Sequence, residues 1–97
     1  MESVSAKRRV RVPNSDGLHL RAAAALAQVA KVFRSEIRIR TGERQADAKC
    51  VFDLLTLVAE CGTKLTLEAQ GADSQEAINA MADTIVNGFR SLERSYI

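Results

Sequence analysis

The sequence predicts an α+β fold, an open-faced sandwich in which three helices cover one face of a four-stranded antiparallel sheet. Four short segments alternate apolar and polar residues, and three others repeat apolar residues at helical spacing, in the order βαββαβα. The chain has 97 residues, of which 46% are apolar, so it can bury one core but not two. We expect a single domain over residues 1–97, with its core at about residues 8–91 and short tails at both ends.

The first strand and the first helix flank a loop. A strand is expected at residues 8–13, because Val10 and Val12 alternate with arginines until a proline ends the pattern. Residues 14–17 are all turn formers. A helix is expected from residue 20 to about residue 33, a stretch rich in alanine and free of glycine and proline. The loop therefore leads directly into the helix.

The middle of the chain predicts a hairpin and a short helix. Ile37 and Ile39 alternate with arginines, and this pattern stops at Gly42. Residues 45–48 would pair back on that strand. Apolar residues at helical spacing then predict a second helix at about residues 51–58.

The last strand and the last helix complete the order. Leucines alternate with polar residues in a strand that ends at Gly71. Asp73 is expected to cap the final helix, because Glu76 follows three residues later and apolar residues then recur at helical spacing. This helix is expected to run to about Ser91.

Composition argues against membrane and nucleic-acid proteins. Charged residues interrupt the apolar stretches well before the roughly 20 residues of a membrane span, and residues 1–6 lack the apolar segment of a secretory signal. A net charge of +2 is too small to indicate nucleic acid, and the aromatic residues fall in or after predicted helices, away from the strands that stack RNA bases. We expect a cytoplasmic protein with no membrane insertion and no nucleic-acid partner.

The two cysteines do not by themselves form a disulfide framework or a four-ligand zinc site. We expect both to be reduced thiols, and we expect no metal site and no cofactor. Cys50 precedes the second predicted helix, whose positive end would favour a thiolate. A redox or metal role is therefore one alternative for Cys50, although we expect a buried and inert side chain.

The only histidine, His19, stands where the loop enters the first helix. The first amides of a helix lack internal partners and its dipole is positive there, so this end attracts anions such as phosphate and disfavours imidazolium. A neutral imidazole is nucleophilic, Arg21 could neutralise a phosphoryl group, and Gly17 would let the loop backbone approach closely. From these residues alone, a capping or surface histidine remains the more common alternative.

Several motifs in fixed register strengthen the chemical interpretation. They are GLH-x-R at residues 17–21, SEI at 35–37, AK-x-x-F-x-L-x-T-L at 48–57 and G-x-D-x-x-x-A at 71–77. From about residue 8 to residue 89, the chain resembles the histidine phosphocarrier (HPr) family of the bacterial phosphoenolpyruvate-dependent sugar phosphotransferase system.

The resemblance implies a phosphocarrier, a protein that is modified once per cycle and is not an enzyme. His19 would accept a phosphoryl group on Nδ1 from Enzyme I and donate it to an EIIA-type protein. Arg21 would help hold the group, and Gly17, Leu20 and Ala22 would form the surrounding loop and helix start. We expect a monomer.

Both partners would dock on an apolar surface beside the histidine. By resemblance this docking patch includes Leu20, Ala24, Val51, Phe52 and Leu55. The alternative for Val51 and Leu55 is that they belong to the core. The alternative function is an HPr-like regulatory module of a nitrogen-type or incomplete phosphotransferase system that acts by docking alone. Retention of His19 and Arg21 favours the carrier.

Three residues depart from the family pattern. Ala22 replaces a usual proline, so the helix entry is expected to be less rigid. Cys50 replaces a serine that a regulatory kinase phosphorylates in many members. Val58 replaces a common glycine, which affects the expected course of the next loop.

One feature of the sequence is not explained by the resemblance. Five cations occupy outward positions of the predicted strands, which makes the open sheet face basic. They are Arg9, Arg11, Arg38, Arg40 and Lys64. Either the face is simply solvated, or it binds an additional acidic partner.

Overall fold

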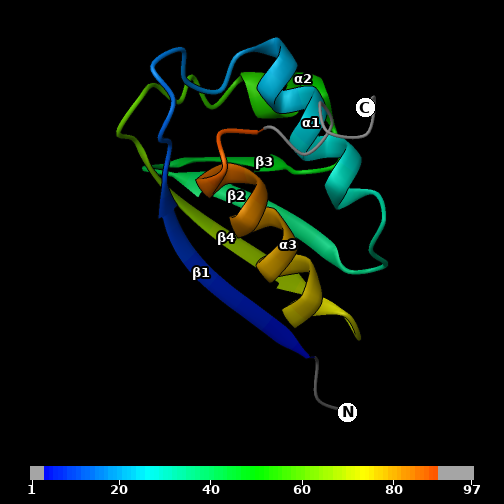
Figure 1. Ribbon diagram of the computed structural model, residues 1–97. Helices are drawn as coiled ribbons and strands as arrows, with labels where there is room; N and C mark the ends of the chain where they lie inside the picture. The colour runs from blue at the N-terminus through cyan, green and yellow to red at the C-terminus, as the bar shows by residue number, and fades with distance from the viewer. Residues whose placement is uncertain (1–3, 90–97) are drawn as a thin grey trace.

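The computed structural model describes residues 4–89 and confirms the predicted order of elements (Figure 1). The elements are β1 (Ser5–Arg11), α1 (Leu20–Ala30), β2 (Glu36–Thr41), β3 (Arg44–Asp47), α2 (Val51–Leu55), β4 (Lys64–Gln70) and α3 (Ser74–Val86).

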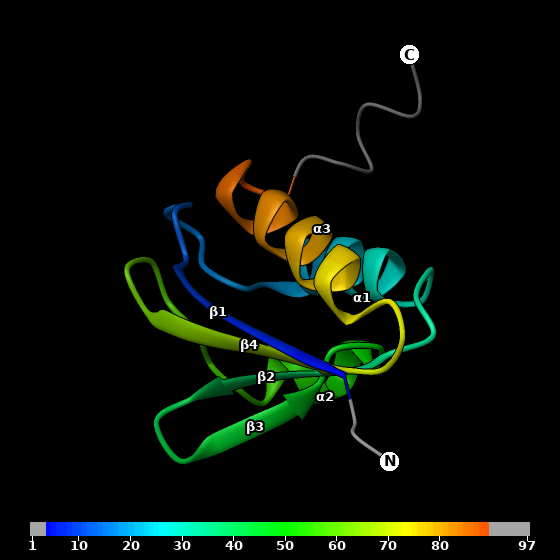
Figure 2. The same cartoon turned by 90° about the horizontal axis from the view of Figure 1, so that it is seen from below.

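The four strands form one antiparallel sheet in the order β1-β4-β2-β3. Helices α1 and α3 lie over one face of this sheet, and the opposite face is open (Figure 2). Helix α2 contacts α1 and β3. The predicted open-faced sandwich is therefore confirmed.

The core lies between the covered face of the sheet and the helices. Alternate residues of β2 and β4 point into it, because successive side chains of a strand lie on opposite faces. The helices contribute apolar residues at helical spacing. The largest buried side chains of the two layers are Ile37, Ile39, Leu65 and Leu67 from the sheet and Leu26, Ile78, Met81 and Ile85 from the helices.

The strands and helices differ from their predicted bounds mainly at the ends. Strand β1 begins at Ser5 because it pairs with the full length of β4, so that Ser5 lies opposite Gln70. Helix α1 ends at Ala30, and the amides of the next two residues after its C-cap form short-range turn hydrogen bonds. Strand β3 covers residues 44–47 in place of the expected 45–48.

Helix α3 also ends earlier than expected, at Val86. Gly88 and Phe89 both have positive φ angles, +72° and +65°, and their amides donate to carbonyls of the last helical turns. This left-handed ending stops the helix. The predicted end at Ser91 lies outside the described residues.

The prediction that Asp73 caps α3 is confirmed for its position, although its side chain makes no capping bond. Asp73 stands at the N-cap position but its carboxylate makes no capping hydrogen bond. It accepts instead from the backbone amides of Arg34 and Ser35, each at 2.9 Å, and from the Ser35 hydroxyl. These donors, the Ser35 hydroxyl first and then the Arg34 amide, hold the pKa of Asp73 below its ordinary value of 3.8. The carboxylate therefore ties the loop before β2 to the start of α3.

Candidate functional site

His19 is the N-cap residue of α1 and is exposed to solvent. Its backbone is extended, and its carbonyl accepts the first hydrogen bond of the helix from Ala23 at 2.8 Å. Its ring replaces the usual capping oxygen, because Nδ1 accepts a hydrogen bond from the Arg21 amide at 3.2 Å. The one histidine of the chain is thus fixed at the positive end of a helix, as the sequence predicted.

This hydrogen bond has a chemical consequence. An acceptor nitrogen must carry a lone pair, so the ring in this arrangement is neutral and holds its proton on Nε2. A neutral imidazole with a lone pair on Nδ1 is a nucleophile. In this arrangement the lone pair of Nδ1 faces the first turn of the helix, which the sequence alone could not show.

The start of α1 also offers unused donors. Within the described residues 4–89, the backbone amides of Leu20 and Ala22 form no hydrogen bond. Together with the Arg21 amide they belong to the first turn, where the helix dipole is positive. An anion on Nδ1 of His19 would meet these N–H groups directly.

The loop before His19 is held by its contacts with the segment after α2. Gly17 has a φ of +69°, and the amide of Leu18 donates to the carbonyl of Ala59 at 2.8 Å. The Asn14 side-chain amide donates to the Gly17 carbonyl at 2.8 Å and closes the loop. Gly17 thus serves the packing of the loop on Ala59, and it does not line the hollow beside His19.

A hollow of about 780 Å³ lies beside His19 and gathers residues from both ends of the described chain. Arg21 lines it together with Leu20 and Ala22, so three of the predicted site residues lie beside His19. The other lining residues were not predicted from the sequence; they are Asn14, Asp16, Gly88 and Phe89. Asn14 and Asp16 were visible only as turn formers, and no local pattern places the end of α3 beside the start of α1.

The predicted docking patch combines exposed and half-buried apolar residues. The side chains of Leu20 and Phe52 are large and apolar, yet these residues remain 61% and 78% exposed. Ala24 is half-buried. Val51 and Leu55 are half-buried and pack against the core, so each contributes to the core and also leaves part of its side chain on the surface. Because α1 and α2 are in contact, these residues come from neighbouring helices.

The three departures from the family pattern have distinct structural settings. Ala22 is buried in the first turn of α1, where its amide needs no internal partner. Cys50 is exposed, so the prediction of a buried cysteine is wrong; it precedes α2 without a side-chain capping bond. Val58 has a φ of +51°, a left-handed conformation that strains a β-branched residue and that glycine adopts freely.

Two kinds of site are absent from the described part of the chain. Residues 4–89 contain no group of three or more histidine, cysteine or acidic side chains placed to hold a metal ion. No helix among these residues has the length and apolar character needed to span a bilayer.

Comparison with known proteins gives consistent matches. The family profile described as "PTS HPr component phosphorylation site" matches residues 6–87, which include His19 and Arg21. The chain is 42% identical over 76 residues to phosphocarrier protein HPr of Cupriavidus necator, covering 78% of this chain and 85% of that protein. It is 41% identical over 75 residues to phosphocarrier protein NPr of Shewanella violacea, covering 77% and 82% respectively.

A solved structure extends the comparison to the fold. The crystal structure of a phosphocarrier protein HPr from Bacillus anthracis superposes with a TM-score of 0.79 at 30% identity. The match covers 84% of this chain and 96% of that one.

Proposed function

Because this chain belongs to the HPr family of phosphocarrier proteins, we propose that it carries its phosphoryl group on Nδ1 of His19. The protein is a phosphocarrier of the phosphotransferase system and acts in a phosphoryl relay with other proteins of that system. It is a stoichiometric carrier and not a catalyst. The observation that supports His19 most directly is the hydrogen bond from the Arg21 amide to its Nδ1 atom.

The proposed transfer is a displacement at phosphorus. The lone pair of Nδ1 leaves the Arg21 amide and forms a bond to phosphorus, while the bond between phosphorus and the donor breaks and its electron pair returns to the donor. The proton on Nε2 stays in place as the phosphoryl group arrives. The released Arg21 N–H then donates to a phosphoryl oxygen. The same amide therefore binds Nδ1 in the free protein and the phosphoryl group in the phosphorylated protein.

Stabilisation of the transferred group follows from its surroundings. The free amides of Leu20 and Ala22 can donate to phosphoryl oxygens. The guanidinium of Arg21 lines the same hollow and supplies a positive charge where negative charge gathers during transfer. Because the site is exposed, the phosphoryl group remains accessible to the next protein.

The proposed partners are Enzyme I as donor and an EIIA-type protein as acceptor. The docking patch of Leu20, Ala24, Val51, Phe52 and Leu55 supports this proposal. Leu20 lines the hollow beside His19, and Leu20 and Phe52 are exposed apolar side chains of the kind that lose contact with water when a partner docks.

The proposal includes a monomer that works in the cytoplasm. Cys50 and Cys61 are free thiols, which fits a reducing compartment.

Incubation with Enzyme I and phosphoenolpyruvate tests the proposed function. The protein should gain the mass of one phosphoryl group in a bond that is stable to alkali and labile to acid. His19→Ala should abolish the gain, and Arg21→Ala should slow it by about tenfold or more, with partial recovery in Arg21→Lys. An equal gain in the His19→Ala variant would overturn the assignment.

A further inference from the structure

The open face of the sheet carries a pattern that phosphoryl transfer does not use. Its outward residues on all four strands are polar or charged, because the apolar partners in the alternation point to the core. All five cations that the sequence placed there are exposed on this face, and Lys7 joins them. We define the basic face by these six residues: Lys7, Arg9, Arg11, Arg38, Arg40 and Lys64.

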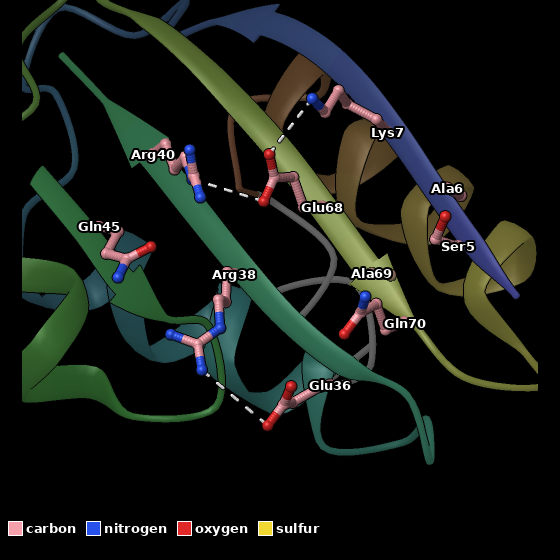
Figure 3. Close-up of a pocket in the computed structure, with 10 residues that line it drawn as sticks. All are labelled: Ser5, Ala6, Lys7, Glu36, Arg38, Arg40, Gln45, Glu68, Ala69 and Gln70. Carbon is pink, nitrogen blue, oxygen red and sulfur yellow. Dashed lines mark ion pairs between the residues drawn. The ribbon is translucent and has the colours of Figure 1, made fainter. Parts of the chain in front are cut away.

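Acidic residues occupy only part of the open face. Glu68 bridges two neighbouring strands, at 3.5 Å from Lys7 and 3.4 Å from Arg40 (Figure 3). Glu36 lies 4.0 Å from Arg38. These contacts leave an excess of positive charge, since six cations face Glu36, Asp47 and Glu68.

The excess is concentrated at one end of the sheet. Arg11 lies opposite Lys64, and Arg9 lies opposite Thr66, so no carboxylate occupies these two rows of β1 and β4. The guanidinium of Arg11 donates to the carbonyl of Gly62, in the turn before β4, at 3.0 Å. Three cations on adjacent positions would repel one another, and an anionic ligand would relieve this repulsion.

The remainder of the face is hollowed. A depression of about 570 Å³ is lined by the Lys7, Arg38 and Arg40 side chains and by Glu36 and Glu68 (Figure 3). The side chains of Gln45 and Gln70 add amide donors and acceptors to its wall. The depression therefore offers charges of both signs, whereas the end with Arg9, Arg11 and Lys64 offers positive charge alone.

We propose that the basic face docks an acidic polypeptide segment of a partner protein. Its carboxylates would contact Arg9, Arg11 and Lys64, and its neutral or basic groups would enter the depression around Glu68. Because the outward residues of the four strands are polar or charged, recognition would rest on charge and hydrogen bonds. The inference is independent of the proposed phosphoryl transfer, because α1 and α3 lie over the other face of the sheet (Figure 2) and His19 is the N-cap residue of α1.

Two other occupants fit the face less well. A nucleic acid carries negative charge throughout and would be repelled by Glu36 and Glu68, and no aromatic side chain lies on a strand among the described residues to stack its bases. A second copy of this chain would bring the same excess of cations against itself. A polypeptide can alternate its charges to match both parts of the face.

Binding of a fluorescein-labelled peptide, in which about five glutamates are followed by about five glutamine and glycine residues, tests the proposal; binding is measured by fluorescence anisotropy at low salt. The variant Arg9→Glu/Lys64→Glu changes the face, and Lys31→Glu/Arg34→Glu is the control. Lys31 and Arg34 are exposed and lie outside the strands, and both double variants lower the net charge equally. A second face variant, Arg9→Gln/Lys64→Gln, removes the charges without reversing them, and thermal unfolding verifies that each variant folds.

The face variant with glutamates should weaken peptide binding about tenfold or more, the glutamine variant should weaken it to a smaller degree, and the control should bind like the wild type. Equal losses in face and control variants would show a net-charge effect and overturn the proposal. Absence of binding to the wild type would overturn it as well. Tighter binding of a single-stranded oligonucleotide of equal charge would assign the face to nucleic acid instead.

Discussion

The carbonyl oxygen of Ala59 lies 2.6 Å from the position that a Cβ on Gly17 would occupy. The same oxygen accepts the amide of Leu18, so the loop that ends at His19 is pressed against the segment after α2. The position of the candidate phosphoryl carrier thus depends on a glycine and on a backbone atom more than forty residues away in sequence.

Replacement of Gly17 by alanine should therefore disturb both stability and phosphorylation. The new Cβ would meet backbone atoms, and the φ of +69° is itself unfavourable for alanine. We expect a loss of about 2 kcal/mol or more in the free energy of unfolding, and slower phosphorylation by Enzyme I. Gly42→Ala is the matched control, because Gly42 has a φ of +59° but no atom within 4 Å of its added Cβ. Equal losses in the two variants would show that the contact with Ala59 is unimportant.

Val58→Gly should stabilise the protein. Val58 is 64% exposed and has a φ of +51°, so glycine would remove backbone strain and give up little buried surface. We expect a gain of about 1 kcal/mol in the free energy of unfolding, measured by urea denaturation. Val32→Gly provides the comparison, because Val32 is 76% exposed and is not among the residues with positive φ. A loss of stability in Val58→Gly as large as in Val32→Gly would contradict this account.

Asp73 should make stability depend on acidity. Its hydrogen bonds with Ser35 and Arg34 favour the carboxylate and place its folded pKa below 3.8, the ordinary value. The stabilisation is complete above about pH 4 and is lost as the pH falls through the folded pKa. Asp73→Asn should lower the melting temperature at pH 7 and should show a smaller further decrease between about pH 5 and pH 2 than the wild type.

The control for Asp73 is Asp83→Asn. Asp83 is an exposed residue of α3 whose carboxylate makes no hydrogen bond or ion pair within residues 4–89. This variant should keep the acid sensitivity of the wild type. The same reduction of acid sensitivity in both variants would show that the hydrogen bonds of Asp73 do not cause the pH dependence of stability.

Substitution in the docking patch should weaken the relay without unfolding the protein. Phe52→Ser changes a side chain that is 78% exposed, so we expect little loss of stability. The apparent KM of Enzyme I for the carrier should rise by about tenfold, because an exposed aromatic residue is a frequent anchor of protein interfaces. Val86→Ser, at a residue that is 61% exposed but lies on α3 outside the patch, should leave this KM unchanged.

The fold was predictable where side-chain pattern and local propensity agree. Ile37 and Ile39 alternate with exposed arginines, and in the structure both belong to β2 and are buried in the core. The ends of helices were less predictable because tertiary contacts decide them. Asp73 stands at the cap position that its sequence predicts. Its carboxylate, however, accepts hydrogen bonds from the Ser35 hydroxyl and from two backbone amides of another loop.

The candidate site divides in the same way. His19 and Arg21 could be predicted because both belong to one local segment with a clear helix start. Gly88 and Phe89 line the same hollow from the far end of α3, and only the packed fold brings them there. The exposure of Cys50 was also missed, because its surroundings depend on how the short helix α2 packs.

Nuclear magnetic resonance of the phosphorylated protein, labelled with ¹⁵N in histidine, tests the central claim most directly. His19 is the only histidine, so the spectrum contains a single pair of ring nitrogens. The hydrogen bond between Nδ1 and the Arg21 amide predicts that phosphorus couples to Nδ1 while Nε2 does not take the phosphoryl group. Coupling of phosphorus to Nε2, or phosphorylation without coupling to either nitrogen, would contradict the account.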